Sequence, residues 1–105
     1  AETAPATEVV HLGRDPFAHH GFVNTPVYRG STVLYPTLAS LEAKTQAYTY
    51  GRRGTPTVRA LESALTSLAG GADTKLTASG YQAVTTALLA FAQSGDHILM
   101  VDTVY

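Results

Sequence analysis

The pattern of hydrophobic and polar positions changes near residue 55. Upstream, "GRDPFAHHGFVNTPVYRGSTVLYPT" (residues 13–37) mixes proline, glycine, asparagine and aromatic residues without sustained helical or strand periodicity. Such a stretch predicts an extended arm that packs on another domain or subunit. A short helix is expected over residues 37–47, with Thr37 as its N-cap.

Downstream of residue 55 the periodicity becomes helical. Thr55 is a suitable N-cap, and Pro56 occupies the first helical position, where its missing N–H and fixed φ are tolerated. Gly70 and Gly71 supply a stop signal. Apolar residues recur between them at helical spacing, at Val58, Leu61, Leu65 and Leu68. The pattern predicts an amphipathic helix over residues 56–69.

A strand–helix–strand pattern is predicted next. Residues 74–78 form a strand candidate, Ser79 is the N-cap of a helix that ends at Gly95, and residues 97–102 ("HILMVD") form a continuous apolar run typical of a buried strand. In a βαβ unit of this kind, the helix N-terminus at "ASGY" (residues 78–81) points free N–H groups and a helix dipole into a crevice. A phosphate is the expected occupant.

Composition narrows the class of protein. The 105 residues, of which 45% are hydrophobic, suffice for one small domain at most. A net charge of −1 provides no global field for nucleic acid or anionic membranes, so any anion site must be local. No cysteine is present, which excludes disulfides, thiolate metal sites and a cysteine nucleophile. We expect a soluble cytoplasmic protein without a membrane segment, and a piece of a longer chain, because no capping element follows the last apolar run.

Taken singly, the candidate motifs have limited specificity. The paired arginines of "YTYGRRGTPT" (residues 48–57) are more often a solvated loop than an anion site, and a Ser-Gly pair opening a helix is more often only an N-cap. The four histidines lack paired helical spacing with a carboxylate, so no metal site is predicted. Asp96 and Asp102 are not expected to be catalytic. For Arg53 and Arg59 a salt bridge is favoured over a role in substrate recognition.

The motifs together resemble a known family. "VNTPVYRGSTVLY" (23–35), "YGRRGTPT" (50–57), "ASGYQAV" (78–84) and "GDHILMVDTVY" (95–105) are similar, in order and spacing, to the N-terminal part of the pyridoxal-phosphate-dependent enzymes of cysteine and methionine metabolism. Most members of that family read Tyr-Ser-Arg-x-x-Asn-Pro-Thr at the second motif. The variant here, with Gly51 after Tyr50, most resembles the bacterial cystathionine β-lyases.

The resemblance implies a fold, an assembly and a site. Residues 1–54 would form an N-terminal arm and an inter-subunit loop, and residues 55–105 the start of the α/β large domain of a fold type I (aspartate aminotransferase-like) enzyme. The resemblance implies a homotetramer that is built from dimers, in which the two subunits of each dimer share their active sites. Tyr50 and Arg52 match residues that reach the cofactor phosphate of the neighbouring subunit, which suits a phenol and a guanidinium. Gly80 and Tyr81 match residues whose backbone N–H groups bind that phosphate.

Tyr105 matches the tyrosine that stacks on the cofactor ring and takes part in proton transfer, so Tyr50 and Tyr105 are the implied catalytic residues. Without the resemblance, Tyr105 would be taken as an aromatic residue at a strand end. The family's Schiff-base lysine lies downstream of this tyrosine, and neither Lys44 nor Lys75 has its sequence context. The 105 residues alone are therefore expected to be inactive.

For the whole protein, the resemblance implies β-elimination from cystathionine to homocysteine, pyruvate and ammonia, a transsulfuration step of methionine biosynthesis. Three relatives with other reactions remain open: cystathionine γ-synthase, cystathionine γ-lyase and methionine γ-lyase. Two readings from other classes also remain open. A nucleotide-binding βαβ domain would explain "ASGY" but not the tyrosine–arginine loop, and a non-catalytic assembly segment would explain the arm.

Overall fold

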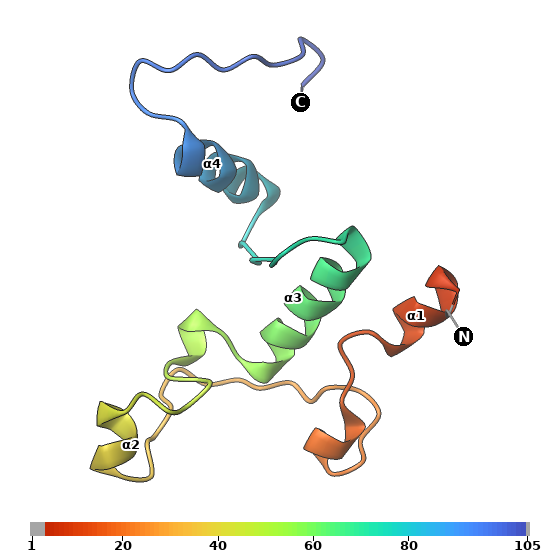
Figure 1. Ribbon diagram of the computed structural model, residues 1–105, viewed down its shortest axis with the longest axis vertical. Coiled ribbons are helices and arrows are strands. Elements are labelled where there is room, and N and C mark those ends of the chain that lie inside the picture. The colour runs from red at the N-terminus through yellow and green to blue at the C-terminus, as the bar shows by residue number, and fades with distance from the viewer. Residues whose placement is uncertain (1–3, 105) are drawn as a thin grey trace. The chain divides into compact units, whose positions relative to one another are not determined.

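The computed structural model describes residues 4–104, which belong to two units considered separately below (Figure 1). The first unit runs to Lys75 and the second comprises residues 76–105. The first unit contains α1 (Pro5–His11), η1 (Pro16–His19), α2 (Leu38–Glu42), η2 (Gly51–Arg53) and α3 (Pro56–Ala69). The second contains α4 (Gly80–Phe91).

Helix α3 has the bounds that its sequence predicts. The Thr55 hydroxyl accepts a hydrogen bond from the Val58 amide at 3.3 Å, and Pro56 is the first helical residue. Gly70 ends the helix in the left-handed region, at φ 61°, where a residue without Cβ meets no steric penalty. Local capping therefore defines both ends of this helix.

The arm of the first unit is partly helical and is tied to the start of α3. Helices α1 and η1 lie within a stretch for which no helix was predicted. The Thr57 hydroxyl accepts a hydrogen bond from the Tyr28 amide at 2.8 Å and donates one to the Pro26 carbonyl at 2.7 Å. Gly13, at φ +69°, passes so close to α3 that a Cβ built on it would lie 2.5 Å from the Ala60 carbonyl oxygen. These backbone approaches place the arm beside the first turns of α3.

Helix α2 begins as predicted but ends early. Thr37 and Ser40 form a reciprocal capping box, in which the Ser40 amide donates to the Thr37 hydroxyl at 3.1 Å. The prediction of a helix to residue 47 is wrong, since α2 ends at Glu42. Lys44 adopts a left-handed φ of 51°, which terminates the helical path.

Helix α4 also begins at its predicted cap. The Gln82 amide donates to the Ser79 hydroxyl at 3.1 Å. The predicted end at Gly95 is wrong, because the helix stops at Phe91. The Asp96 carboxylate accepts a hydrogen bond from the Gln93 amide at 2.7 Å, and this contact builds a separate turn after the helix.

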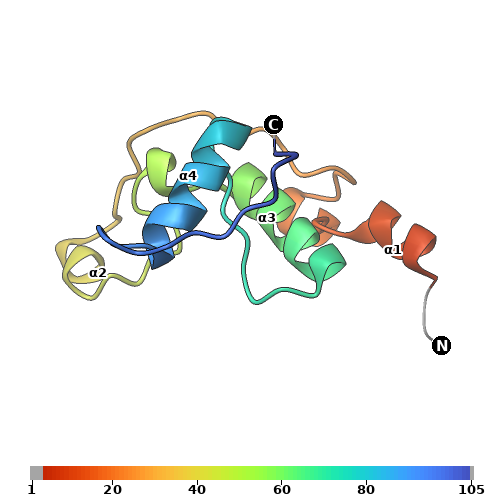
Figure 2. The same ribbon diagram turned by 90° about the horizontal axis from the view of Figure 1, so that it is seen from above.

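The two predicted strands, over residues 74–78 and 97–102, are not formed. The only β-pairing in the described part of the chain is an isolated bridge between Thr32 and Tyr50. A strand is stabilised by a ladder of hydrogen bonds to a neighbour, and neither segment has one among residues 4–104. Figure 2 shows the stretch after α4 running on without secondary structure. Leu99, in the middle of the second apolar run, is fully exposed.

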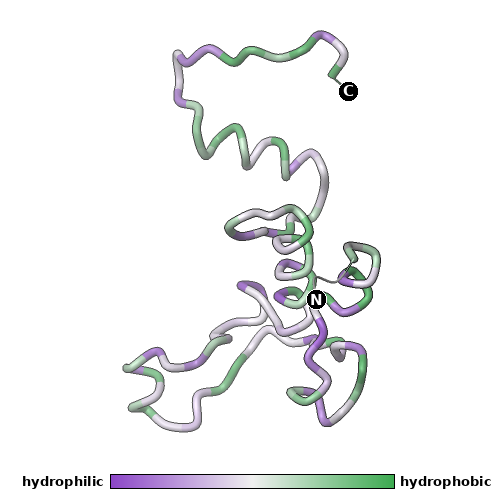
Figure 3. Tube along the Cα trace, turned by 45° about the vertical axis from the view of Figure 1, so that its right-hand side comes forward, coloured by the Kyte–Doolittle hydropathy of each residue, from purple (hydrophilic) through white to green (hydrophobic). Residues whose placement is uncertain are grey.

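Hydrophobic side chains do not form a buried core in the described residues, where the one buried residue is Glu62, at 6% exposure. Phe17 and Phe91 are 95% and 90% exposed. Figure 3 shows how hydrophobic residues follow one another along α4 and the segment after it. Among residues 4–104, no helix has the length and hydropathy needed to cross a membrane.

Candidate functional site

The segment Tyr50–Gly54, here called the arginine loop, connects the arm to α3. Tyr50 is extended, and its carbonyl accepts a hydrogen bond from the Arg53 amide at 2.9 Å, which closes the single 3-10 turn of η2. Gly54 then adopts φ 146°, a conformation that side-chain-bearing residues rarely tolerate, and leads directly into the N-cap of α3. The loop is a defined turn between two anchored segments.

The arginine loop is also paired with the arm. The Gly51 amide donates to the Ser31 carbonyl at 2.8 Å, beside the antiparallel bridge between Thr32 and Tyr50. Gly51 lies so close to this segment that a Cβ added to it would collide with the carbonyl oxygen of Gly30. Two backbones are therefore in direct contact at the base of the loop.

The polar groups of the arginine loop are available for a ligand. Arg52 and Arg53 are exposed, and neither forms an ion pair within the described residues, whereas Arg59 does. Tyr50 is 40% exposed. A guanidinium and a phenol together provide several N–H donors and one O–H donor, which suit a phosphate dianion. Arg53 has a different setting, because it lines a hollow of about 190 Å³ together with Tyr48 and Arg59.

The N-terminus of α4 provides a second set of donors, in the second unit. The side chain of Ser79 is occupied by the Gln82 amide, and that of Gln82 accepts a hydrogen bond from the Ala78 amide at 3.1 Å. The amides of Gly80 and Tyr81 donate no hydrogen bond among the described residues of this unit. A Cβ on Gly80 would meet no atom within 4 Å, so an anion can approach this backbone closely.

The structure thus places the sequence-predicted site residues in two groups. Tyr50 and Arg52 lie together in the arginine loop, and Gly80 and Tyr81 lie together in the first turn of α4. Tyr105 lies outside the described residues. Within residues 4–104, no group of three histidine or carboxylate side chains is arranged to hold a metal ion.

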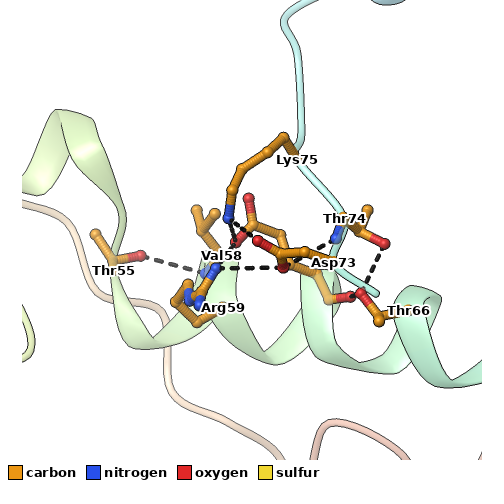
Figure 4. A network of polar contacts seen from close by, with 8 residues as sticks. Thr55, Val58, Arg59, Thr66, Asp73, Thr74 and Lys75 are labelled. Atoms are coloured by element: carbon orange, nitrogen blue, oxygen red, sulfur yellow. Dashed lines mark hydrogen bonds and ion pairs between the residues drawn. The ribbon is translucent and has the colours of Figure 1, made fainter. Parts of the chain in front are cut away.

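A buried carboxylate on α3 is a feature that the hydrophobic pattern does not single out. The Arg59 guanidinium lies 2.8 Å from the Glu62 carboxylate, and the Lys75 ammonium lies 3.7 Å from it (Figure 4). The predicted salt bridge is confirmed for Arg59, whereas Arg53 forms no ion pair within the described residues. The sequence signal of the Arg59 salt bridge is the spacing of three residues between an arginine and a glutamate on one helix.

The network continues into the segment after α3. Asp73 accepts from the Lys75 ammonium at 2.8 Å and from the Thr74 amide at 2.9 Å (Figure 4). The hydrogen bond from Lys75, followed by that from the Thr74 amide, holds the pKa of Asp73 below its usual value. The hydrogen bond to Glu62 raises the pKa of Arg59. The charged groups fix residues 73–75 to α3 and leave Arg59 committed to a structural role.

Comparison with known proteins connects these features to a family. Residues 6–105 match the family described as Cys/Met metabolism PLP-dependent enzyme, where PLP is pyridoxal 5′-phosphate. The chain belongs to this family. The match includes the arginine loop, the N-terminus of α4 and the segments on either side of them.

Individual relatives show the same relationship. The chain is 52% identical over 99 residues to a Rhizobium johnstonii protein named "Putative cystathionine beta-lyase", covering 94% of this chain and 25% of that protein. It is 38% identical to the cystathionine beta-lyase of Salmonella typhimurium, covering 94% of this chain and 26% of the relative. It is 35% identical to the cystathionine gamma-synthase of Mycobacterium bovis, covering 98% of this chain and 26% of the relative. The chain thus spans about a quarter of the length of these relatives.

Proposed function

We propose that the chain is the N-terminal part of a pyridoxal-phosphate-dependent carbon–sulfur lyase, a cystathionine β-lyase that converts L-cystathionine into homocysteine, pyruvate and ammonia. The observation that carries the proposal is the arginine loop, in which Tyr50 and Arg52 are both exposed on either side of Gly51, while Arg59 is paired with Glu62. The names of three relatives, which are 52%, 48% and 38% identical to the chain, support the same reaction.

The chemistry of the donors fits the phosphate of the cofactor. In the proposed site, Arg52 and Tyr50 bind the phosphate oxygens through charge-assisted and neutral hydrogen bonds. The same phosphate is proposed to accept hydrogen bonds from the Gly80 and Tyr81 amides of the neighbouring subunit, at the positive end of that subunit's α4. Tyr105 supports the cofactor ring and relays a proton through its phenol. When bound, the cofactor supplies an electron sink for the carbanion formed next to the substrate amine.

The proposed architecture is that of a fold type I enzyme. Residues 1–54 form the arm and the loop that crosses to a neighbouring subunit, and residues 55–105 begin the cofactor-binding α/β domain. The active protein is proposed to be a cytoplasmic homotetramer built from dimers that share active sites, and to act in methionine biosynthesis. Tyr50 and Arg52 would then serve the cofactor of the partner subunit.

Neither lysine of this chain suits attachment of the cofactor. Lys75 donates to Asp73 at 2.8 Å, and Lys44 is an exposed residue at the end of α2. We propose that the reactive lysine lies in the part of the protein that follows this segment. The 105 residues alone are then inactive, and the full-length protein is the species to assay.

The two adjacent arginines provide an internal test. Pyridoxal 5′-phosphate is titrated into the full-length protein and its variants, and the absorbance of the bound cofactor gives the dissociation constant. Arg52→Ala should weaken binding at least about tenfold, or about 1.4 kcal/mol, because a charge-assisted hydrogen bond is lost. Arg53→Ala is the matched control and should change binding less than about threefold. Equal effects, or a wild-type protein that binds no cofactor, would contradict the proposal.

The identity of the reaction is tested through its keto acid. β-Elimination from cystathionine releases pyruvate, whereas γ-elimination releases 2-oxobutyrate. The 35% identity to a cystathionine gamma-synthase makes this distinction necessary. We expect pyruvate as the main product, and 2-oxobutyrate in its place would move the protein to a γ-eliminating member of the family.

A further inference from the structure

We propose that Gly51 is a positioning residue, which sets the orientation of Tyr50 and Arg52 by allowing the arginine loop to rest directly on the backbone of Gly30 and Ser31. This inference depends on the proposed function for its cofactor readout. It assigns a role to a residue that does not itself touch the phosphate. It also gives the arm a task, namely to provide the surface against which the loop is held.

The geometry at this contact is specific. A Cβ on Gly51 would collide with the carbonyl oxygen of Gly30 and would lie 2.8 Å from the Gly30 carbonyl carbon and 3.2 Å from the Ser31 Cα. All three are backbone atoms, which cannot rotate away as the end of a flexible side chain can. The Gly51 amide donates to the Ser31 carbonyl at 2.8 Å from the same position. Most members of the family carry serine at this position, so the restriction belongs to the arm of this chain: here a side chain at residue 51 requires the arm to move.

The need for glycine is steric and not conformational. The φ angle of Gly51 is not positive, whereas that of Gly54 is 146°. An alanine could adopt the backbone angles of residue 51, so its only obstacle is the contact with the arm. A displaced arm would lose the hydrogen bond from residue 51 to Ser31, and with it the bridge between Thr32 and Tyr50. Tyr50 and Arg52 flank residue 51, so both side chains would be redirected.

Gly30 offers a matched control from the other side of the contact. A Cβ on Gly30 would meet no atom within 4 Å, and Gly30 has no positive φ. Gly30→Ala and Gly51→Ala thus make the same chemical change in two glycines that face each other. The proposal predicts a large effect for one of them and a small effect for the other.

The test titrates pyridoxal 5′-phosphate into the full-length wild type and both variants. Gly51→Ala should raise the dissociation constant at least about tenfold and Gly30→Ala less than about twofold. Amide hydrogen exchange at residue 51 should be faster in Gly51→Ala than in Gly30→Ala, because its acceptor on Ser31 is displaced. A Gly51→Ala protein that binds the cofactor as tightly as the wild type would overturn the inference.

A double-mutant cycle separates positioning from a general loss of structure. When Arg52 has already been replaced by alanine, its guanidinium can no longer be misplaced. Gly51→Ala should then weaken binding further by less than about threefold. An undiminished tenfold effect in that background would overturn the positioning role. If Gly51→Ala does not fold, Ser31→Gly loosens the same arm segment without a collision and should weaken binding about threefold, while unchanged binding would count against the inference.

A wild-type protein that binds no cofactor would refute the function proposed above, and hydrogen exchange at residue 51 would then decide the contact alone. In that case, faster exchange in Gly51→Ala than in Gly30→Ala would support the steric part of the inference. Equal exchange in the two variants would overturn it.

Discussion

Helices α3 and α4 begin in the same way but are stabilised differently. Each starts at a hydroxyl N-cap, Thr55 for α3 and Ser79 for α4. Helix α3 is joined to the arm through Thr57 and to residues 73–75 through the buried Glu62. Helix α4 contains no charged residue and buries none of its side chains.

The contrast shows that hydrophobic periodicity and burial are separate properties. Most large apolar residues of α4 are more exposed than those of α3: Leu89 is 73% and Phe91 90% exposed, against 39% for Leu65, and Leu88 at 38% is the exception on α4. Helix α3 is held largely by polar contacts that are already complete within its unit. Helix α4 presents apolar surface that isolated helices in water do not sustain, so we expect the rest of the protein to cover it.

The strongest test of this contrast is Phe91→Ala. If α4 is covered in the full-length protein, the substitution should destabilise that protein by about 3–5 kcal/mol, the usual cost of removing a buried phenylalanine. In the isolated 105-residue chain the same change should have almost no effect, because the side chain is 90% exposed there. Hydrogen exchange of the α4 amides measures both. Equal effects in the two lengths would show that α4 needs no further partner.

A somewhat smaller effect is expected for Glu62→Ala on α3. The substitution leaves Arg59 and Lys75 without their shared carboxylate, and we expect a loss of about 1–3 kcal/mol. The figure is below that of a fully buried pair because the partner side chains are 50% and 66% exposed. Hydrogen exchange of the α3 amides is the measurement. Glu42→Ala, at an exposed acidic residue of α2, is the control and should change stability by less than about 0.5 kcal/mol.

Removal of the two N-caps compares the helices directly. Ser79→Ala and Thr55→Ala each remove one hydroxyl acceptor, worth about 1 kcal/mol. In the 105-residue chain, the loss should fray the first turn of α4 more than that of α3, because Thr57 still ties α3 to Pro26 and Tyr28. Amide exchange at Gln82 and Val58 reports on the two turns. The reverse order would mean that the arm does not support α3.

The smallest expected effect concerns pH. The pKa of Asp73 is lower in the folded chain than its ordinary value of 3.8. The ionised carboxylate therefore stabilises the fold at pH values above 3.8, and this contribution is lost as the pH falls through the lower pKa of the folded state. The stability difference between the wild type and Asp73→Asn should therefore be constant from neutral pH down to about 3.8 and then shrink. A difference that disappears well above that pH would mean that Lys75 does not pair with Asp73 in solution.

The sequence predicts the local features of the fold well. Thr37, Thr55 and Ser79 are N-caps as predicted, and Gly70 ends α3, because each signal acts within a few residues of the chain. The strands over residues 74–78 and 97–102 could not be judged in this way. The apolar run at residues 97–102 indicates which side chains a strand would bury, but a hydrogen-bonded ladder needs a neighbouring strand, and neither segment has one among the described residues.

The candidate site likewise contains some features that could be predicted from the sequence and others that could not. The arginine loop and the N-terminus of α4 could be recognised from short motifs, since a phosphate site needs particular donors at particular spacings. The contact between Gly51 and Gly30 could not, because it joins residues far apart in sequence through backbone atoms that carry no side-chain signature. The spacing of Arg59 and Glu62 indicated their ion pair, but the contact of Glu62 with Lys75 could not be predicted, because Lys75 lies beyond the helix.

The hydroxyl caps have a consequence for how the chain is made on the ribosome. The hydroxyls of Thr37, Thr55 and Ser79 each accept a hydrogen bond from the amide three residues later. The start of each of these three helices is therefore specified as soon as its first turn has been synthesised. If the full-length protein covers α4, as we expect, the helices can adopt their registers before the covering segment is synthesised. Until that segment is made, the apolar side chains of α4 would stay exposed on an already formed helix. The nascent chain would then be prone to aggregate and would need chaperones during synthesis.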